Sequence, residues 1–265
     1  MRDRSDPPVS GASFGANPSF ADLLRDSQPE VMRSDRAIST TDVSVSHGTT
    51  VLGLKYADGV IMAGDRRATA GYTVADTKMR KVFAADDYSA IAIAGAAGQA
   101  IEMVKLFQLE LEHYEKITGD RLSLEGKANR LAQMIRSNFP LALQGLVVVP
   151  LFGGFDHSVG QGRIFYYDAT GGRWEEDDYQ TTGSGGQPAK NSLKKRWRAD
   201  LSRSEALRVA VEALVDAAED DVATGGPDPV RRIFPNALAV TVSGAVDVPE
   251  DEIATAVATV LEERS

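Results

Sequence analysis

The predicted order of helices and strands is the feature of this sequence that most limits its fold. Apolar alternation and turn signals predict strands at 50–56, 60–64, 81–85, 90–95, 146–152, 163–167 and 236–242. Helical spacing predicts helices at 99–117, 122–139, 188–200 and 203–218, and a last helix that opens at Pro249. Helices therefore arrive in pairs between groups of strands. A doubly wound fold alternates single helices with strands, so two antiparallel sheets covered by helical layers fit this order better.

The first part of the chain differs in composition from the rest. Residues 1–48 hold four prolines, many serines and charges that alternate in sign. Such a segment buries too little apolar surface to offset chain entropy, so we expect it to be mobile or only locally ordered. From Thr49 onward there is no internal repeat and no long linker, which predicts one domain over residues 49–265.

Charge and cysteine content exclude several classes of protein. The net charge of −9 argues against nucleic acid, whose phosphates need a basic face, and against an anionic membrane surface. No apolar run approaches the ~20 residues of a membrane helix, and the N-terminus lacks the apolar core of a secretory signal, so we expect a cytoplasmic protein. Without cysteine the chain has no disulfides, no thiolate zinc site and no cysteine nucleophile.

Histidine and glycine motifs offer little chemistry. His113 lies in a charged predicted helix and His157 in a predicted loop, and neither position suggests the orienting carboxylate of a Ser-His-Asp triad. No H-E-x-x-H and no P-loop pattern occurs. The run Gly183-Ser184-Gly185-Gly186 could imitate a phosphate cradle, but the G-x-G-x-x-G pattern fails at Pro188. No cluster implies a metal or an organic cofactor.

The junction between Gly48 and Thr49 is the remaining candidate for chemistry. A threonine hydroxyl is little ionised at pH 7 and needs a base, which its own α-amine can supply if the chain begins there. That amine has an ordinary pKa of about 7.7–8.0, close to the working pH. Self-cleavage between Gly48 and Thr49 would create a chain that begins with Thr49. Glycine suits the position before the cut, because it has no side chain to hinder attack of the Thr49 hydroxyl on its carbonyl. The alternative is a turn that leads into a strand, and Gly-Thr-Thr alone does not decide between them.

Several further motifs resemble one family, the proteasome β subunits. The motifs are Gly64-Asp65-Arg66-Arg67-Ala68-Thr69, Met79-Arg80-Lys81-Val82, Gly95-Ala96-Ala97-Gly98, Thr182-Gly183-Ser184-Gly185 and residues 220–226. Counted from Thr49, the Asp, Lys and Gly stand where that family carries its own, and the similarity runs from Thr49 to the last helix. The chain is most similar to the bacterial branch, including Ala-Thr-Gly-Gly-Pro-Asp at 223–228.

The resemblance implies a fold and a processing event. The fold is of the α+β class, the four-layer αββα sandwich of the N-terminal nucleophile hydrolases, which agrees with the paired helices. Residues 1–48 would be a propeptide that autocleavage between Gly48 and Thr49 removes, and residues 49–265 would be the catalytic domain.

The resemblance also implies catalytic roles. Thr49 would attack the scissile carbonyl, and Lys81 would sit beside its hydroxyl, oriented by Asp65. The amide of Gly95 would donate to the developing oxyanion. The polar group around the Thr49 amine would consist of Ser184, Asp221 and Thr224. Many relatives carry serine where Thr224 stands, which keeps the hydroxyl.

Each assigned residue has a structural alternative. Asp65 could cap a turn after a strand, Lys81 could be one of several surface lysines, and Gly95 could end a strand. Ser184 and Thr224 could serve a turn or a helix cap.

Substrate-binding residues follow from the same resemblance. The first substrate pocket maps onto Ala68, Met79, Ile93 and Ala97, and Arg67 and Thr69 also belong to the expected substrate-binding set. The four pocket residues are apolar, with no acid to pair a basic side chain. We therefore expect cleavage after hydrophobic residues, including aromatic ones.

The implied protein is a threonine endopeptidase that works inside a closed chamber. The resemblance implies seven-membered rings, two of them stacked, with proteasome α subunits, a ring-shaped ATPase or other activator, and unfolded or tagged proteins as substrates. One alternative is the related bacterial two-ring, ATPase-capped protease without α subunits, whose chains are typically shorter and lack so long a leader. Others are a non-catalytic ring subunit and an amidase for small amides. Intact Thr49, Asp65 and Lys81 favour a catalytic subunit.

Overall fold

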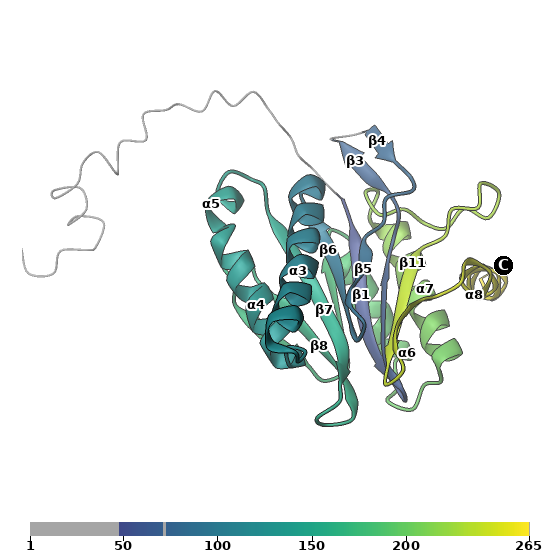
Figure 1. Ribbon diagram of the computed structural model, residues 1–265. Coiled ribbons are helices and arrows are strands. Elements are labelled where there is room, and N and C mark those ends of the chain that lie inside the picture. The colour runs from purple at the N-terminus through teal and green to yellow at the C-terminus, as the bar shows by residue number, and fades with distance from the viewer. Residues whose placement is uncertain (1–47, 71–72, 265) are drawn as a thin grey trace, which may run out of the picture. The chain divides into compact units, whose positions relative to one another are not determined.

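The described part of the chain begins at the predicted cleavage site. The computed structural model describes residues 48–70 and 73–264 (Figure 1). The predicted propeptide lies outside these ranges apart from Gly48, so its mobility and its boundary stay predictions. Within these ranges, no helix combines the length and the apolar character needed to span a membrane.

The first sheet is built around the hairpin that Asp58-Gly59 predicts. Its strands are β1 (Thr50–Tyr56), β2 (Gly59–Gly64), β10 (Tyr179–Gly183), β11 (Asn236–Thr241) and β12 (Gly244–Asp247). They lie in the order β10-β1-β2-β11-β12, and every neighbouring pair is antiparallel. The central strands β1 and β2 are buried along nearly their whole length, and their near-continuous apolar sequences are typical of strands covered on both faces.

The second sheet contains the hairpin predicted around Asp86-Asp87. Its strands are β5 (Val82–Asp86), β6 (Ser89–Gly95), β7 (Val148–Asp156), β8 (Gln161–Tyr167) and β9 (Arg173–Glu176), in that order and all antiparallel. Asp86 Oδ1 accepts hydrogen bonds from the Tyr88 amide at 3.1 Å and the Ser89 hydroxyl at 2.6 Å, which fixes the turn.

Helices cover the outer face of each sheet (Figure 1). Against the second sheet lie α3 (Ala97–Thr118) and α4 (Leu124–Ser137), with the short α5 (Phe139–Ala142) following α4. Against the first sheet lie α6 (Gly186–Arg196) and α7 (Arg203–Asp220), and α8 (Glu250–Glu262) packs on α7. The result is a four-layer sandwich of helices, sheet, sheet and helices, which confirms the predicted fold class.

Serine side chains cap the N-termini of α4 and α7. Ser123 accepts a hydrogen bond from the Gly126 amide at the start of α4. Ser202 forms a reciprocal capping box with Glu205 at the start of α7. These caps satisfy amides that a helix start otherwise leaves without partners.

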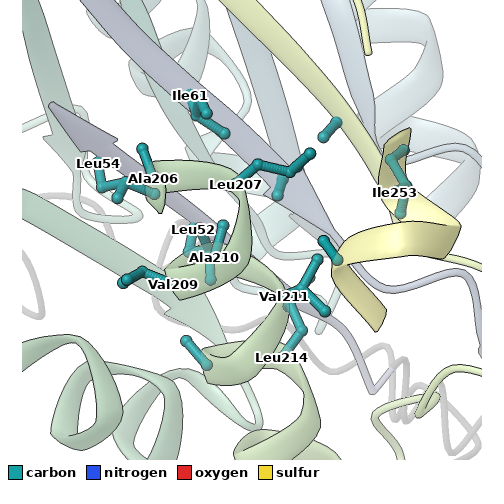
Figure 2. Close-up of a cluster of buried hydrophobic side chains, with 14 of the residues drawn as sticks. Leu52, Leu54, Ile61, Ala206, Leu207, Val209, Ala210, Val211, Leu214 and Ile253 are labelled. Atoms are coloured by element: carbon teal, nitrogen blue, oxygen red, sulfur yellow. The ribbon is translucent and has the colours of Figure 1, made fainter. Parts of the chain in front are cut away.

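Three apolar clusters fill the spaces between the layers. In the first, Leu52 and Ile61 of the first sheet pack against Leu207 and Leu214 of α7 and Ile253 of α8 (Figure 2). The second lies between the two sheets, and the third joins the second sheet to α3 and α4. Each space between neighbouring layers therefore has its own apolar core.

Met62 of β2 lies between the sheets, next to two glycines. A Cβ at Gly53 of β1 would come within 2.7 Å of the Met62 sulfur, and a Cβ at Gly153 of β7 within 2.8 Å. One of these glycines belongs to each sheet. The flexible thioether fills the space that both leave open.

Several elements differ from the predictions. Strands β9, β10 and β12, and the hairpin of β3 (Ala68–Ala70) with β4 (Thr73–Asp76), were not predicted. These strands are only three to five residues long and lack apolar alternation, so pairing with a neighbouring strand decides their conformation. The helix predicted over 122–139 ends at Ser137, and the helix predicted to reach residue 200 ends at Arg196, where Trp197 becomes extended.

Candidate active site

Thr49 is placed immediately before β1, at the end of the first sheet. It is almost fully buried, with 5% of its surface exposed. The residue before it, Gly48, presses against the loop after α7: a Cβ there would come within 1.7 Å of the Ala223 Cβ. The Gly48 amide donates to Thr69 Oγ1 at 3.0 Å. Only glycine fits this position without a shift of the loop that carries Ala223.

Asp65 and Lys81 form an ion pair that is completely buried. Lys81 Nζ lies 2.6 Å from Asp65 Oδ1 and donates to the Arg67 carbonyl at 2.6 Å. Asp65 also accepts the Thr50 amide on Oδ1 and the Arg67 and Gly225 amides on Oδ2, each at 2.9 Å. The carboxylate therefore meets four donors, as a buried charge requires. Asp65 does hold a turn after its strand, and it pairs with Lys81 as well.

Two opposing effects act on the pKa of Lys81. Burial lowers the pKa of Lys81, and the nearby Asp65 carboxylate offsets that effect only in part. The interpretation of Lys81 as a surface lysine is wrong, because none of its side chain is exposed. A buried ammonium of lowered pKa suits the role of orienting or relaying a proton.

Ser184 bonds the Thr49 nitrogen, and Asp221 and Thr224 are joined to Ser184 by further hydrogen bonds. That nitrogen, an amide in the described chain, donates to Ser184 Oγ at 3.2 Å. Asp221 Oδ2 accepts the Ser184 hydroxyl at 2.5 Å and the Thr224 hydroxyl at 2.6 Å, and Oδ1 accepts the Ala223 amide at 3.1 Å. Burial alone would raise the pKa of Asp221, but these hydrogen bonds outweigh it and lower that pKa.

Gly95 ends β6, and its backbone geometry explains why glycine stands there. Its φ of 111° is one that residues with a Cβ rarely adopt, and a Cβ would meet the Val147 carbonyl oxygen at 2.1 Å. The strand-end interpretation is therefore confirmed. Its role as an oxyanion donor stays a prediction.

The expected substrate-binding residues are only partly brought together. Met79 packs against the apolar cluster of the second sheet that contains Ile93, whereas that cluster does not include Ala68 or Ala97. Arg67 donates from its guanidinium to the Val222 carbonyl at 2.9 Å. A pocket shared by all four predicted residues therefore stays a prediction.

Two residues around the site were missed by the sequence analysis. Asn236, the first residue of β11, accepts the Lys81 amide at 3.1 Å and donates to the Val82 carbonyl at 3.0 Å, and so fixes the backbone that carries the lysine. The buried Thr50 hydroxyl lies 2.6 Å from Thr224 Oγ1. A polar residue opening an otherwise apolar strand was the signal in both cases.

No metal site accompanies these residues in the part of the chain that is described. Within residues 48–70 and 73–264, no cluster of three or more His, Cys, Asp or Glu side chains is placed to hold a metal ion.

The fold and the site together define a class of protein. A four-layer αββα sandwich with a threonine before its first strand, beside a buried Lys-Asp pair, is the architecture of the N-terminal nucleophile hydrolases. Residues 45–230 match the family model described as "Proteasome subunit". The chain belongs to the proteasome subunit family.

Curated relatives are β subunits from bacteria. The chain is 57% identical over 219 residues to "Proteasome subunit beta" of Streptomyces griseus, which covers 82% of this chain and 78% of the relative. It is 54% identical over 218 residues to the protein of that name from Frankia casuarinae, covering 82% and 80%. It is also 54% identical over 220 residues to that of Jonesia denitrificans, covering 82% and 72%. These relatives confirm the predicted resemblance to the bacterial branch. Membership of the family implies a peptidase that assembles with other proteasome subunits.

Proposed function

We propose that this chain is the catalytic β subunit of a proteasome core particle, a threonine endopeptidase activated by self-cleavage between Gly48 and Thr49. One observation carries the proposal. The Thr49 nitrogen is held by Ser184 on Asp221, while the next amide is held by Asp65, which is paired with the buried Lys81. The residue that would become the nucleophile is thus tied to both polar groups that a threonine protease needs.

Activation begins with attack of Thr49 Oγ1 on the Gly48 carbonyl carbon. The Gly48–Thr49 C–N bond breaks as the C–O bond forms, so the acyl group moves from nitrogen to oxygen. Water then hydrolyses the ester and leaves a Gly48 carboxylate and a free Thr49 amine. The contact between Gly48 and Thr69, and the close fit of Gly48 against Ala223, support this step because they hold the scissile bond at Thr49.

Turnover uses the same hydroxyl on a peptide substrate. The Thr49 amine takes the hydroxyl proton while Lys81, held by Asp65, stabilises the developing oxygen anion. The acyl-enzyme forms as the amine of the leaving peptide accepts a proton, and water releases the second product. The Gly95 amide is the proposed oxyanion donor, which supplies on the order of 3 kcal/mol in comparable sites.

The proposed assembly is cytoplasmic and follows the family. Two stacked seven-membered rings of this chain would bind rings of α subunits and an ATPase or other activator, and would degrade unfolded or tagged proteins. The β-subunit relatives support this assembly over a two-ring protease without α subunits. Co-purification with an α subunit tests it.

The mechanism is tested by N-terminal sequencing and peptidase assays of the assembled wild-type protein and of Thr49→Ala. We expect a wild-type chain that starts TTVLGL and cuts peptides, and a variant that stays uncut and inactive because no β-hydroxyl precedes β1. Thr118→Ala, at the exposed end of α3, is the control and should behave as wild type. A wild-type particle that keeps residues 1–48 while cutting peptides normally would refute the mechanism.

The proposed preference for hydrophobic side chains before the cut bond has its own test. Because Met79 and Ile93 share an apolar cluster, fluorogenic peptides ending in Leu or Tyr should be cut faster than those ending in Arg. We expect a ratio of kcat/KM of about tenfold or more, typical of an apolar pocket. Faster cleavage of the Arg peptide would overturn this proposal and leave the threonine mechanism intact.

A further inference from the structure

Thr50 is a buried polar residue whose side chain has no role in the mechanism above. It opens β1, none of its surface is exposed, and the following residues Val51 and Leu52 are fully buried and apolar. Valine has almost the same shape and would avoid burying a hydroxyl, which is costly unless that hydroxyl is bonded. A threonine here therefore calls for a physical reason.

The direction of the hydrogen bonds around Thr50 follows from the chemistry of Asp221. A carboxylate only accepts, so the single Thr224 hydroxyl proton points to Asp221 Oδ2 at 2.6 Å. Thr224 Oγ1 must then accept from Thr50 Oγ1, 2.6 Å away. In the same way the Ser184 proton points to Asp221 at 2.5 Å, so Ser184 Oγ accepts from the Thr49 nitrogen. The alternative acceptor of the Ser184 proton, the Thr49 carbonyl, is farther away at 3.5 Å.

The backbone of Thr50 reaches the other half of the site. Its amide donates to Asp65 Oδ1 at 2.9 Å, and the same oxygen accepts Lys81 Nζ at 2.6 Å. Thr50 thus contacts the ion pair through its nitrogen and the hydroxyl network through its side chain. Thr49 directly precedes this doubly anchored residue.

We propose that Thr50 is a positioning residue whose hydroxyl fixes the proton arrangement of the network Thr50–Thr224–Asp221–Ser184 and thereby the Thr49 amine that acts as base. This inference rests on the proposed function. By donating to Thr224, Thr50 strengthens the bond from Thr224 to Asp221 and neutralises part of the charge of that carboxylate. A less negative Asp221 stabilises the protonated amine less and keeps the amine available as a base.

The charged groups around Thr49 come from several segments. Asp221 follows α7, Asp65 follows β2, Lys81 precedes β5, and Arg67 lies between β2 and β3. Lys81 experiences the charges of all the other three. Each of these groups remains when Thr50 loses its hydroxyl, so a changed pH profile reports on the hydroxyl network.

The test compares Thr50→Val, Thr50→Ser and a matched control in the assembled particle. Thr181→Val is the control, because Thr181 lies opposite Leu52 on β10 and bonds the Gly186 carbonyl at 2.7 Å, outside the network. We expect Thr50→Val to lower kcat about tenfold, the effect of one lost hydrogen bond, with KM nearly unchanged. The loss should be greater at about pH 6 than at about pH 8.5, on either side of the ordinary amine pKa, because the amine is then more easily protonated. Thr50→Ser should restore kcat and the pH profile.

Several outcomes would overturn the proposal. Thr50→Val with the wild-type kcat and pH profile would show that the hydroxyl only fills space, and equal losses in Thr50→Val and Thr181→Val would show a general effect on the sheet. If Thr50→Val fails to assemble, Thr50→Ser and Thr50→Ala replace it, and equal activity of those two contradicts the proposal. Activity in Thr49→Ala would instead defeat the proposed function, so the two failures are distinguishable.

Discussion

At the scale of one residue, Lys81 is the buried cation of the candidate site. It stands in Lys78-Met79-Arg80-Lys81, where neighbouring basic residues are exposed, and no periodicity marks it as buried. The structure places its whole side chain inside, on Asp65 and the Arg67 carbonyl. Its burial depends on residues far along the chain, which local patterns do not encode. The family motif predicted that Lys81 pairs with Asp65, whereas the residue types alone did not predict this pair.

Gly48 gives a prediction at the same scale. Gly48→Ala places a Cβ 1.7 Å from the Ala223 Cβ, so the scissile bond must shift away from Thr49. We expect self-cleavage to slow by about 100-fold, the effect of a misplacement of roughly 1 Å. The precursor fraction over time, measured by mass spectrometry, checks this.

A second substitution tests whether a steric clash causes the slower self-cleavage of Gly48→Ala. Ala223→Gly in the Gly48→Ala background removes one of the clashing atoms but leaves the Ala223 backbone at 2.7 Å, so we expect partial recovery of cleavage. Cleavage of Gly48→Ala at the wild-type rate would contradict the steric explanation.

Secondary-structure elements were predictable where burial imposed a pattern. The hairpin β1-β2 and the helices α3 and α7 follow from apolar spacing and turn signals. Strand β10 was missed because its sequence, YQTTG, is polar and takes its conformation from pairing with β1. That strand leads directly to Ser184, so the part of the site it positions could not be derived from local sequence.

Arg163 of β8 supports a prediction about pH at the scale of elements. Its guanidinium bonds Asp156 on β7 and Glu175 on β9, each at 2.8 Å, and Glu125 on α4 at 2.8 Å. Bonding to Arg163 lowers the pKa of Glu175, and bonding to Arg173 and then Arg163 lowers that of Glu125. Carboxylates with a lowered folded-state pKa stabilise the fold above their unfolded pKa, and this stability is lost as pH falls through the folded values.

Arg163→Met should therefore destabilise the protein in a pH-dependent way. We expect a loss of about 2 kcal/mol in the free energy of unfolding at neutral pH, because charged hydrogen bonds are lost. The loss should shrink as pH falls below the ordinary carboxyl pKa of about 4 and through the lower folded-state values, because the carboxylates then become protonated in the folded protein as well. Urea unfolding at neutral pH and at low pH measures this loss of stability. Arg198→Met, which removes an exposed guanidinium at 3.7 Å from its partners, is the control, and an equal loss at both pH values would argue against the ion-pair explanation.

At the scale of the whole molecule, the layers were predictable and the meeting point of the proposed catalytic residues was not. Helices arriving in pairs indicated two covered sheets, and the structure has them. Thr49, Asp65, Lys81, Ser184 and Asp221 are separated by up to 172 positions in the chain. Their convergence depends on strand order, and sequence spacing alone carries no information about that order.

The sulfur of Met62 sits between Gly53 of one sheet and Gly153 of the other. Asp65 directly follows β2, the strand of Met62, in the first sheet, and Lys81 directly precedes β5 of the second, so the spacing between the sheets also sets the distance across the Asp65–Lys81 ion pair. Oxidation of Met62 would add an oxygen atom to its sulfur, and the close packing against Gly53 and Gly153 leaves no room for that atom. Oxidative damage at Met62 would in this way push the two sheets apart and change the geometry of the Asp65–Lys81 pair.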